Sequence, residues 1–353
     1  MKKTLALVFA LAFVASPALA FHDAGVADCA GCHTMHNSQD GALVDPDSPN
    51  GNPYLLVDAS PSDVCLGCHA TGLGAVLATD PLVPGREIGG GNFTFLYEDN
   101  LNDGHNGGLA ANWIPGDAAG HNLDAPGFSL TTDATLTTAP GGAFVASNMG
   151  CTSCHDPHGN ENFRLLYGQR TVQGIYNFTN DAPVAAGGPS IFFGGGEANN
   201  NHTAYVSGMS AWCGNCHGDF HAASTPGNYV HPSGYNMGTT VAGIYNAYNG
   251  TMDQTGGTQA TAYLAAVPFE DASAVPTSEI GPTGTSTVMC LSCHRAHASS
   301  APDAGRWDFG VTLLVEDGVE SLSYPIPDPY ASPNQRSLCN KCHNKDQDDH
   351  ITP

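Results

Sequence analysis

The chain has 353 residues, of which 33 are acidic and only 10 basic, giving a net charge of −23 at neutral pH. This balance excludes a typical nucleic-acid-binding protein, because affinity for phosphate backbones comes from basic side chains. With 43 Gly, 24 Pro and only 12% charged residues, the sequence also buries too little apolar surface to fold around its own side chains alone.

The N-terminus predicts a cleaved secretory signal peptide over residues 1–20. Two lysines open it, residues 5–14 are mostly apolar, and Ala18-Leu19-Ala20 has the small residues of a cleavage site. This apolar run is short for a membrane span, and no later stretch reaches about 18 apolar residues. We therefore expect a protein exported through the periplasm, with no stable membrane span and a single domain over residues 21–353.

Twelve cysteines follow, and all of them lie in six C-x-x-C-H motifs. This motif is the attachment signature of c-type haem: two thiols bind one porphyrin, and the adjacent histidine is the proximal ligand of the iron. Disulfides and zinc sites are alternatives, but neither requires a histidine after every second cysteine. The predicted attachment residues are Cys29, Cys32, Cys65, Cys68, Cys151, Cys154, Cys213, Cys216, Cys290, Cys293, Cys339 and Cys342. The predicted proximal ligands are His33, His69, His155, His217, His294 and His343.

Six covalently bound haems c predict the fold class: mostly coil, with few short helices and minimal strand, wrapped around a continuous chain of haems. We expect short helical turns at the motifs and folding that depends on the cofactor. The motifs are unevenly spaced and do not form a tandem array of identical modules. One echo, TVQGIYN at 171–177 and TVAGIYN at 240–246, is either a repeated wrapping unit or a composition bias.

Ten further histidines are available for the second axial position of the irons. Four of them follow a proximal histidine by three or four residues. These are His36, His158, His221 and His297. Each starts on the proximal side of its own haem, so we expect it to reach the iron of a neighbouring haem; a bond to a haem propionate is the alternative.

The other six histidines have less context. Three of them, His22, His121 and His231, stand alone in loop-like sequence and on this ground would be ordinary surface residues. The remaining three, His105, His202 and His350, are expected at the surface.

Long stretches outside and around the motifs occur along nearly the whole mature chain. They are FHDAGVADCAGCHTMHNS, TTDATLTTAPGG, CTSCHDPHG, GMSAWCGNCHGDFH, TTVAGIYNAYN, GTQATAYLAAVPFEDA, CLSCHRAHAS and RSLCNKCHNKD. In these stretches the chain resembles the hexahaem outer-surface c-type cytochromes that polymerise into conductive filaments, the multihaem cytochrome nanowire family. It departs from that family after His69, where ATGLGAVLATD holds no histidine.

The resemblance implies two axial histidines on every iron and haems that alternate between parallel stacked and T-shaped pairs. It also implies that His36 ligates a haem of the adjacent subunit, the haem held by Cys290, Cys293 and His294. The other distal candidates implied by the family are His22, His121, His158, His221, His231 and His297. With His36 these make seven candidates for six positions, so one of them is not a ligand.

We therefore expect an electron-transfer protein and not an enzyme: a subunit of a head-to-tail homopolymer at the cell outer surface. Its expected partners are other multihaem cytochromes and extracellular electron acceptors such as metal oxides. A monomeric periplasmic or surface electron carrier with the same haems is the alternative. A multihaem reductase is less favoured, because such enzymes keep an iron open and all six motifs here end in histidine.

Overall fold

The computed structural model describes residues 22, 29–70, 76–81, 83–84, 88–97, 116–188, 196–222, 230–251, 253–310, 312–314, 329–332 and 334–344, and all that follows concerns these. The predicted signal peptide, His105 and His350 lie outside the described residues.

Coil and turns make up most of the described backbone, which confirms the fold class predicted from the sequence. The α-helices are α2 (Pro61–His69), α3 (Met209–Cys213) and α4 (Gly238–Ala247). Short strands form four antiparallel pairs: β1 (Ser38–Gln39) with β2 (Ala42–Leu43), β3 (Arg170–Val172) with β4 (Tyr176–Phe178), β5 (Val184–Gly187) with β6 (Thr203–Ser207), and β7 (Tyr235–Asn236) with β8 (Thr287–Val288).

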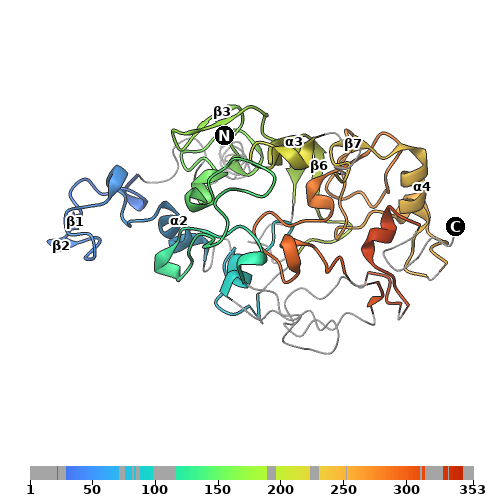
Figure 1. Cartoon of the computed structure of the whole chain (residues 1–353), viewed down its shortest axis with the longest axis horizontal. Coiled ribbons are helices and arrows are strands. Elements are labelled where there is room, and N and C mark those ends of the chain that lie inside the picture. Colours follow the sequence, from blue (N-terminus) through green and yellow to red (C-terminus); the bar gives the residue numbers. More distant parts are fainter. Residues whose placement is uncertain are drawn as a thin grey trace, which may run out of the picture.

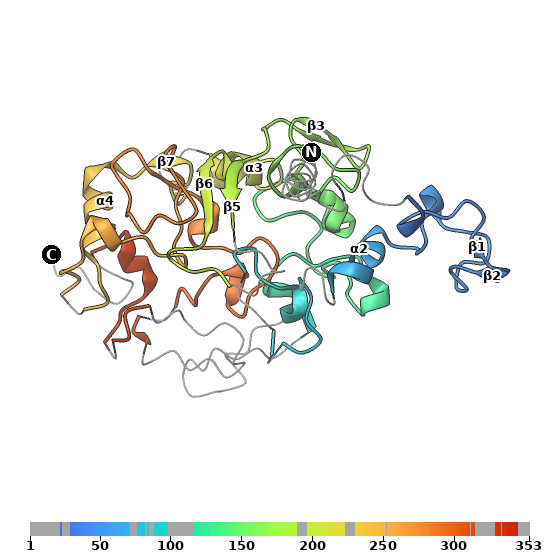
Figure 2. The same cartoon turned by 180° about the vertical axis from the view of Figure 1, so that it is seen from behind.

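The molecule is elongated, with a projection at one end (Figures 1 and 2). The projection, which we call the arm, consists of residues 29–57 and carries the β1–β2 hairpin; it is the blue segment outside the body in both views. Helix α4 lies at the opposite end of the body. The first C-x-x-C-H motif is therefore on the arm, while the later ones lie in or beside the body.

Each C-x-x-C-H motif begins in or just after a short helical turn, as predicted. The turns are η1 (Cys29–Gly31), α2, η8 (Cys151–Ser153), α3, η13 (Cys290–Ser292) and η16 (Leu338–Lys341). In five motifs the histidine N–H donates to the carbonyl of the first cysteine at 2.9–3.0 Å. This bond places the two thiols about one turn apart, with the histidine directly after them.

Helix α2 has the clearest local start signal. The Ser60 side chain accepts hydrogen bonds from the N–H groups of Ser62 and Asp63, and Pro61 occupies the first helical position, where its missing N–H costs nothing. The helix continues to His69 and so contains the whole second motif.

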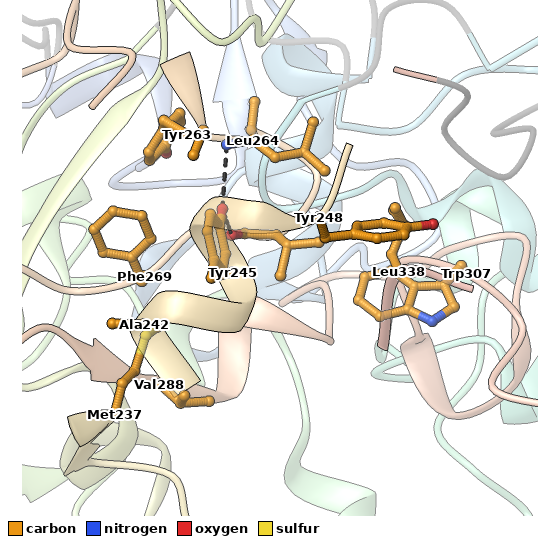
Figure 3. Close-up of a cluster of buried hydrophobic side chains, with 13 residues drawn as sticks. Met237, Ala242, Tyr245, Tyr248, Tyr263, Leu264, Phe269, Val288, Trp307 and Leu338 are labelled. Carbon is orange, nitrogen blue, oxygen red and sulfur yellow. Dashed lines mark hydrogen bonds between the residues drawn. The ribbon is translucent and has the colours of Figure 1, made fainter. Parts of the chain in front are cut away.

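The apolar side chains form several small clusters instead of one core. The largest surrounds α4 and includes Tyr245, Tyr248, Trp307 and Leu338 (Figure 3). Motif cysteines Cys293, Cys339 and Cys342 pack against this cluster. Side-chain clusters therefore lie between the attachment sites, as expected of a chain wrapped around cofactors.

The two echoes of T-V-x-G-I-Y-N have different structures. Residues 171–177 run from β3 through a turn at Gly174 (φ 73°) into β4, whereas residues 240–246 lie inside helix α4. The echo is therefore not a repeated structural unit, because tertiary surroundings override the local preference of the same heptad.

Within the part of the chain that the structure describes, no helix combines the length and apolar character needed to cross a bilayer.

Candidate functional site

Four of the motif histidines are oriented by a hydrogen bond from Nδ1 to a backbone carbonyl. His33 faces Tyr54 O at 3.0 Å, His155 faces Arg164 O at 2.7 Å, His217 faces Pro140 O at 2.7 Å, and His294 faces Asp303 O at 2.9 Å. A carbonyl can only accept, so the proton is on Nδ1 and the Nε2 lone pair is left free. This is the arrangement by which proteins fix a metal-ligating imidazole.

Three of these carbonyls belong to one recurring turn after the first, third and fifth motifs. The turn has two consecutive non-glycine residues in the left-handed region, with φ between 52° and 58°. The pairs are Tyr54 and Leu55, Arg164 and Leu165, and Asp303 and Ala304. In each turn the second residue's carbonyl accepts from the N–H that follows the motif histidine, at 2.6–2.8 Å. The turn thus folds back onto the motif and orients its imidazole.

Part of this recurrence is visible in the sequence. Residues 52–56 read NPYLL and residues 162–166 read NFRLL, so an N-x-x-L-L pattern marks the first two turns. The third turn, APDAG at 301–305, has no such match, and only the backbone identifies it.

Other imidazoles stand opposite four of the motif histidines. The ring centroids are 6.3 Å apart for His33 and His158, 6.1 Å for His69 and His22, 5.9 Å for His217 and His121, and 6.2 Å for His343 and His231. A metal–nitrogen bond of about 2 Å on each side, plus about 1 Å from nitrogen to ring centre, puts two axial imidazoles about 6 Å apart. The residues therefore fit one iron between each pair.

The third motif has a less direct opposite group. His297 packs on Phe93, with centroids 4.4 Å apart, and burial followed by the nearby His155 lowers the pKa of His297 to about 3. Its Nδ1 is buried and makes no hydrogen bond of good geometry, although the Gly91 backbone lies close to the ring. A buried, neutral imidazole next to the third motif is suited to metal ligation.

The fifth motif differs from the others. The ring of His294 meets the edge of Phe309 at 5.5 Å, and among the described residues no imidazole is paired with it at the spacing seen in the other sites. The fifth site therefore has a proximal imidazole but no opposing one from the described part of its own chain.

Two of the seven distal candidates face no motif histidine among the described residues. His36 is exposed on the arm, directly before the β1–β2 hairpin, and its neighbour Met35 is 78% exposed. His221 lies in η11 (Gly218–His221), beside Gly214 and Gly234, and its Nδ1 is buried without a hydrogen-bond partner. The structure separates these two from the five candidates that lie opposite or beside a motif histidine.

The pairings reveal three successive units that the uneven motif spacing conceals. Each unit contains an isolated histidine, a motif with a trailing histidine three residues on, and a second motif; we name them unit A (22–69), unit B (121–217) and unit C (231–343). The isolated histidine pairs with the second motif of its own unit. The trailing His158 of unit B stands opposite His33 of the first motif of unit A, and the trailing His297 of unit C is influenced by His155 of the first motif of unit B.

This regularity is compatible with the expectation that the motifs do not form a tandem array of identical modules, because the three units differ in length, but it adds an order that was not predicted from the sequence. Isolated histidines were indistinguishable from surface residues when each was considered alone. The repeated order His, C-x-x-C-H-x-x-H, C-x-x-C-H is the sequence signal that could have found the units.

The cysteines order the six sites in space. The Cys65 thiol is hydrogen-bonded to Cys151, which raises the pKa of Cys65, and the Cys213 thiol is likewise bonded to Cys290. Burial is the largest cause of the raised pKa of three further cysteines, and a cysteine of the following motif is the second cause. The pairs are Cys32 with Cys68, Cys154 with Cys216, and Cys293 with Cys339. The cysteines of successive motifs are thus neighbours in space, in the order of the sequence.

The expectation that His202 lies at the surface is wrong. It is only 2% exposed, and its ring stacks on Tyr263 with centroids 3.8 Å apart. Both ring nitrogens lie 3.0 Å from carbonyl oxygens, those of Thr203 and Ser278. It therefore acts as a bridge between two loops of the body, a role that an isolated histidine in a polar stretch did not indicate.

Known proteins share these features. The Doubled CXXCH motif family matches residues 22–73 and 143–174. The C-type cytochrome OmcS of Geobacter sulfurreducens is 34% identical over an alignment of 439 residues that covers 98% of this chain and 99% of the relative. Two solved structures, the Outer Membrane Cytochrome S filament from the same organism and its OmcS nanowires, are 32% and 33% identical. Both align with a TM-score of 0.76 and cover 92% of this chain and all of theirs.

Proposed function

Because this chain belongs to the OmcS family of multihaem c-type cytochromes, we propose that it is the subunit of an electron-conducting filament at the cell outer surface. The relative with solved structures is a filament, and the alignment extends over nearly the full length of both chains. In this proposal the subunit carries six covalently bound haems c, one at each C-x-x-C-H motif.

The chain's own residues hold and isolate each haem site. The paired cysteines anchor the cofactor covalently, and the carbonyl bonds at Nδ1 direct Nε2 of the motif histidine toward the iron. An imidazole on the second side leaves no open coordination position for water or a substrate. When bound, the haems supply reversible one-electron exchange between ferric and ferrous iron. We therefore propose electron transfer without substrate chemistry, so the protein is not an enzyme.

The observation that carries the filament proposal is that the unit pattern leaves one histidine and one motif unmatched among the described residues. The trailing His36 of unit A is exposed on the arm and faces no motif histidine there. The first motif of unit C has a proximal His294 whose ring meets Phe309, with no opposing imidazole from the described part of the chain. His36 of one copy and His294 of the next complete the pattern across a subunit boundary.

A contact of this kind is head-to-tail. It joins two different surfaces of the same chain, so it propagates into an open polymer unless the rotation between copies closes a ring. The projecting arm at one end of an elongated body suits such a contact (Figure 1). The order of the sites, each motif beside the next, would then continue from one copy into its neighbour.

The test is the substitution His36→Ala, compared with the matched control His221→Ala. His36→Ala should abolish filaments in electron micrographs and turn one haem in six high-spin, because the fifth iron loses its second ligand. His221→Ala removes the histidine that has no place in the unit pattern, so filaments and low-spin spectra should persist. Normal filaments from the His36 variant would refute the proposal that His36 ligates the fifth site of the adjacent subunit.

The same experiment distinguishes the filament subunit from a monomeric electron carrier. A monomeric periplasmic or surface carrier would show no filaments in the unaltered protein and no response to His36→Ala beyond a local spectral change. The proposed partners are other multihaem cytochromes as electron donors and extracellular acceptors such as metal oxides. The net charge of −23 suits docking to basic faces or to surfaces bearing adsorbed cations.

A further inference from the structure

One charged side chain stands out among the spacers of the six motifs. The two residues between the cysteines are Ala-Gly, Leu-Gly, Thr-Ser, Gly-Asn, Leu-Ser and, in the sixth motif, Asn-Lys. Lys341 is thus the single charged residue at twelve equivalent positions. Its relative exposure is 0%, although lysine is among the residues least often buried.

An aromatic cage surrounds the Lys341 ammonium. Nζ lies 4.0 Å from the ring centroid of Tyr245, 5.7 Å from that of Tyr330 and 6.0 Å from that of Tyr248. It also donates to the carbonyl oxygens of Ala262 at 3.2 Å and Tyr248 at 3.4 Å. The described groups that meet the ammonium are therefore neutral, and each offers it a partial negative charge.

The cage is built from elements that hold it firmly. Tyr245 and Tyr248 are three residues apart at the end of α4, and the Lys341 ammonium lies within 6.0 Å of both ring centroids. The Tyr245 hydroxyl donates to Val267 O at 2.7 Å, and the Tyr248 hydroxyl donates to Arg336 O at 2.9 Å. Tyr330 packs edge-on against Tyr248 with centroids 5.4 Å apart. The position of the ammonium is consequently fixed relative to the sixth motif.

The charge is solvated by this cage but not cancelled. Among the described residues, the ion pair joins Arg170 and Asp156, and no carboxylate of that part of the chain lies within ion-pair distance of Lys341. Packing alone is a weak explanation for the lysine, because an apolar side chain of similar volume would fill the same space without desolvating an ion. A buried and unneutralised charge acts over longer distances than an exposed one, since little water screens it.

We infer that Lys341 raises the reduction potential of the haem at the sixth motif, so that the last site of the series holds an electron more tightly than it would without this charge. The inference rests on the proposed function in that the sixth motif carries a haem. Reduction adds one electron to the iron and no proton, and the ammonium offsets part of that negative charge. Fixed charges and burial near the cofactor are among the means by which a protein sets haem potentials.

The sixth site differs in ring orientation from the three other sites at which two described imidazoles face each other. The rings of His231 and His343 are inclined by 73°, whereas the interplanar angles are 9° at the first site, 18° at the second and 39° at the fourth. Nearly perpendicular axial imidazoles give a low-spin ferric signal with a larger maximum g value than nearly parallel ones. Electron paramagnetic resonance during a redox titration therefore reports the potential of this site.

The experiment compares the filament protein with Lys341→Met and Tyr248→Phe variants at pH 6. Lys341→Met keeps the length of the side chain and removes the charge. The signal from perpendicular ligands should then be reduced at a lower potential, by about 59 mV for each tenfold change in the electron-transfer equilibrium. Tyr248→Phe perturbs the same cluster but keeps the charge, so its potential should not move.

An unchanged potential in Lys341→Met, or an equal shift in Tyr248→Phe, would overturn the inference and assign Lys341 to packing alone. Lys341→Gln, which keeps hydrogen bonds to the two carbonyls, gives the same readout should the methionine variant fail to mature. Failure of the proposed function has a different signature: the unaltered protein would then have fewer than six haems by mass or form no filaments.

Discussion

Individual backbone carbonyls orient the motif histidines. Several of these carbonyls belong to residues whose backbone conformation is unfavourable. Arg164 has a φ of 52°, in the left-handed region that costs a non-glycine residue about 1–2 kcal/mol. Its carbonyl accepts the His155 Nδ1–H at 2.7 Å. The turn therefore contains a conformationally unfavourable residue whose carbonyl orients a single imidazole.

This cost predicts opposite effects for two substitutions at Arg164. Arg164→Asn should leave the midpoint of thermal unfolding unchanged or slightly raised, because asparagine tolerates the left-handed region. Arg164→Val should destabilise by about 1–2 kcal/mol, since a β-branched residue is most strained there. Calorimetry on both variants checks the difference. Equal midpoints would mean that the backbone conformation at this turn is not strained.

A second residue, Glu270, predicts a dependence of stability on pH. Its side chain is 5% exposed and accepts the Met209 N–H at 2.6 Å, and burial raises its pKa. The folded protein then binds this proton more tightly than the unfolded chain does. Stability should therefore fall as pH rises from the unfolded-state pKa through the raised folded-state pKa.

Glu270→Gln should remove that fall and flatten the profile of unfolding midpoint against pH on the acid side. Gln keeps an oxygen that accepts from Met209, so the effect isolates the charge. Glu279→Gln, at an exposed position, is the matched control and should reproduce the profile of the unaltered chain. A Glu270→Gln profile as steep as the unaltered one would contradict the assignment.

At the scale of single residues, the sequence predicts the sites where chemistry dictates a fixed spacing, whereas reasoning failed where burial decides. The motif histidines and cysteines are predicted from spacing alone, and the structure adds a carbonyl that orients four of the imidazoles. Nothing in the sequence distinguished the buried His202 from a surface histidine, because its surroundings come from Tyr263 and Ser278, far along the chain.

At the scale of elements, the arm shows how a short segment can present one side chain. Its hairpin turns at Asp40 and Gly41, whose φ values of 52° and 84° match the two-residue turn that such a pair favours. Asn37, next to His36, is 4% exposed, and its amide donates to Asp45 O at 2.9 Å and Ser48 O at 2.7 Å. It also accepts the Asp45 N–H, so one side chain closes the loop behind the histidine.

Asn37→Ala should therefore reduce polymer formation more than it reduces haem content. Loss of these buried hydrogen bonds costs about 1 kcal/mol or more for each unsatisfied group and frees the loop that holds His36. Sedimentation of polymer, measured together with haem per chain, separates the two effects. Ser38→Ala changes an exposed neighbour on the same hairpin and should leave both unchanged. Equal polymer yields from the two variants would rule out this role for Asn37.

Helical turns at the motifs were predictable because the geometry of thioether attachment requires them. The remaining elements were not, as the heptad T-V-x-G-I-Y-N demonstrates by forming a hairpin at 171–177 and a helix at 240–246. Where local preference is weak, the surfaces against which a segment packs decide its conformation, and in this protein many of those surfaces belong to cofactors.

At the scale of the whole molecule, the attachment sites differ in whether they lie on the arm or in the body. The first site is on the arm, outside the body, whereas the fourth lies inside it, where Cys213 meets Cys290 of the next site (Figure 2). The fold class could be predicted from six attachment motifs and a glycine-rich chain. The path of the chain between sites could not, because local sequence preferences do not determine it.

Loss of single haems should therefore have unequal consequences. Replacing Cys29 and Cys32 with alanine should leave a protease-resistant body with five haems, because the arm contributes little to its packing. Replacing Cys213 and Cys216 should expose much of the chain to protease, since the side-chain clusters pack around the sites they surround. Limited proteolysis with haem counting by mass spectrometry measures both. Equal resistance would show that the body folds independently of its central cofactor.

The arm at one end of the body also has a kinetic consequence for the polymer. Joined head-to-tail, a polymer has chemically distinct tips: one displays an unused His36 and the other an uncapped His294. A subunit lacking His36 can still be added to the first tip. It then offers no His36 to the fifth site of the next copy, so it acts as a chain terminator. The fraction of such subunits in a mixture would then set the length distribution of the wires, much as chain stoppers do in synthetic polymers.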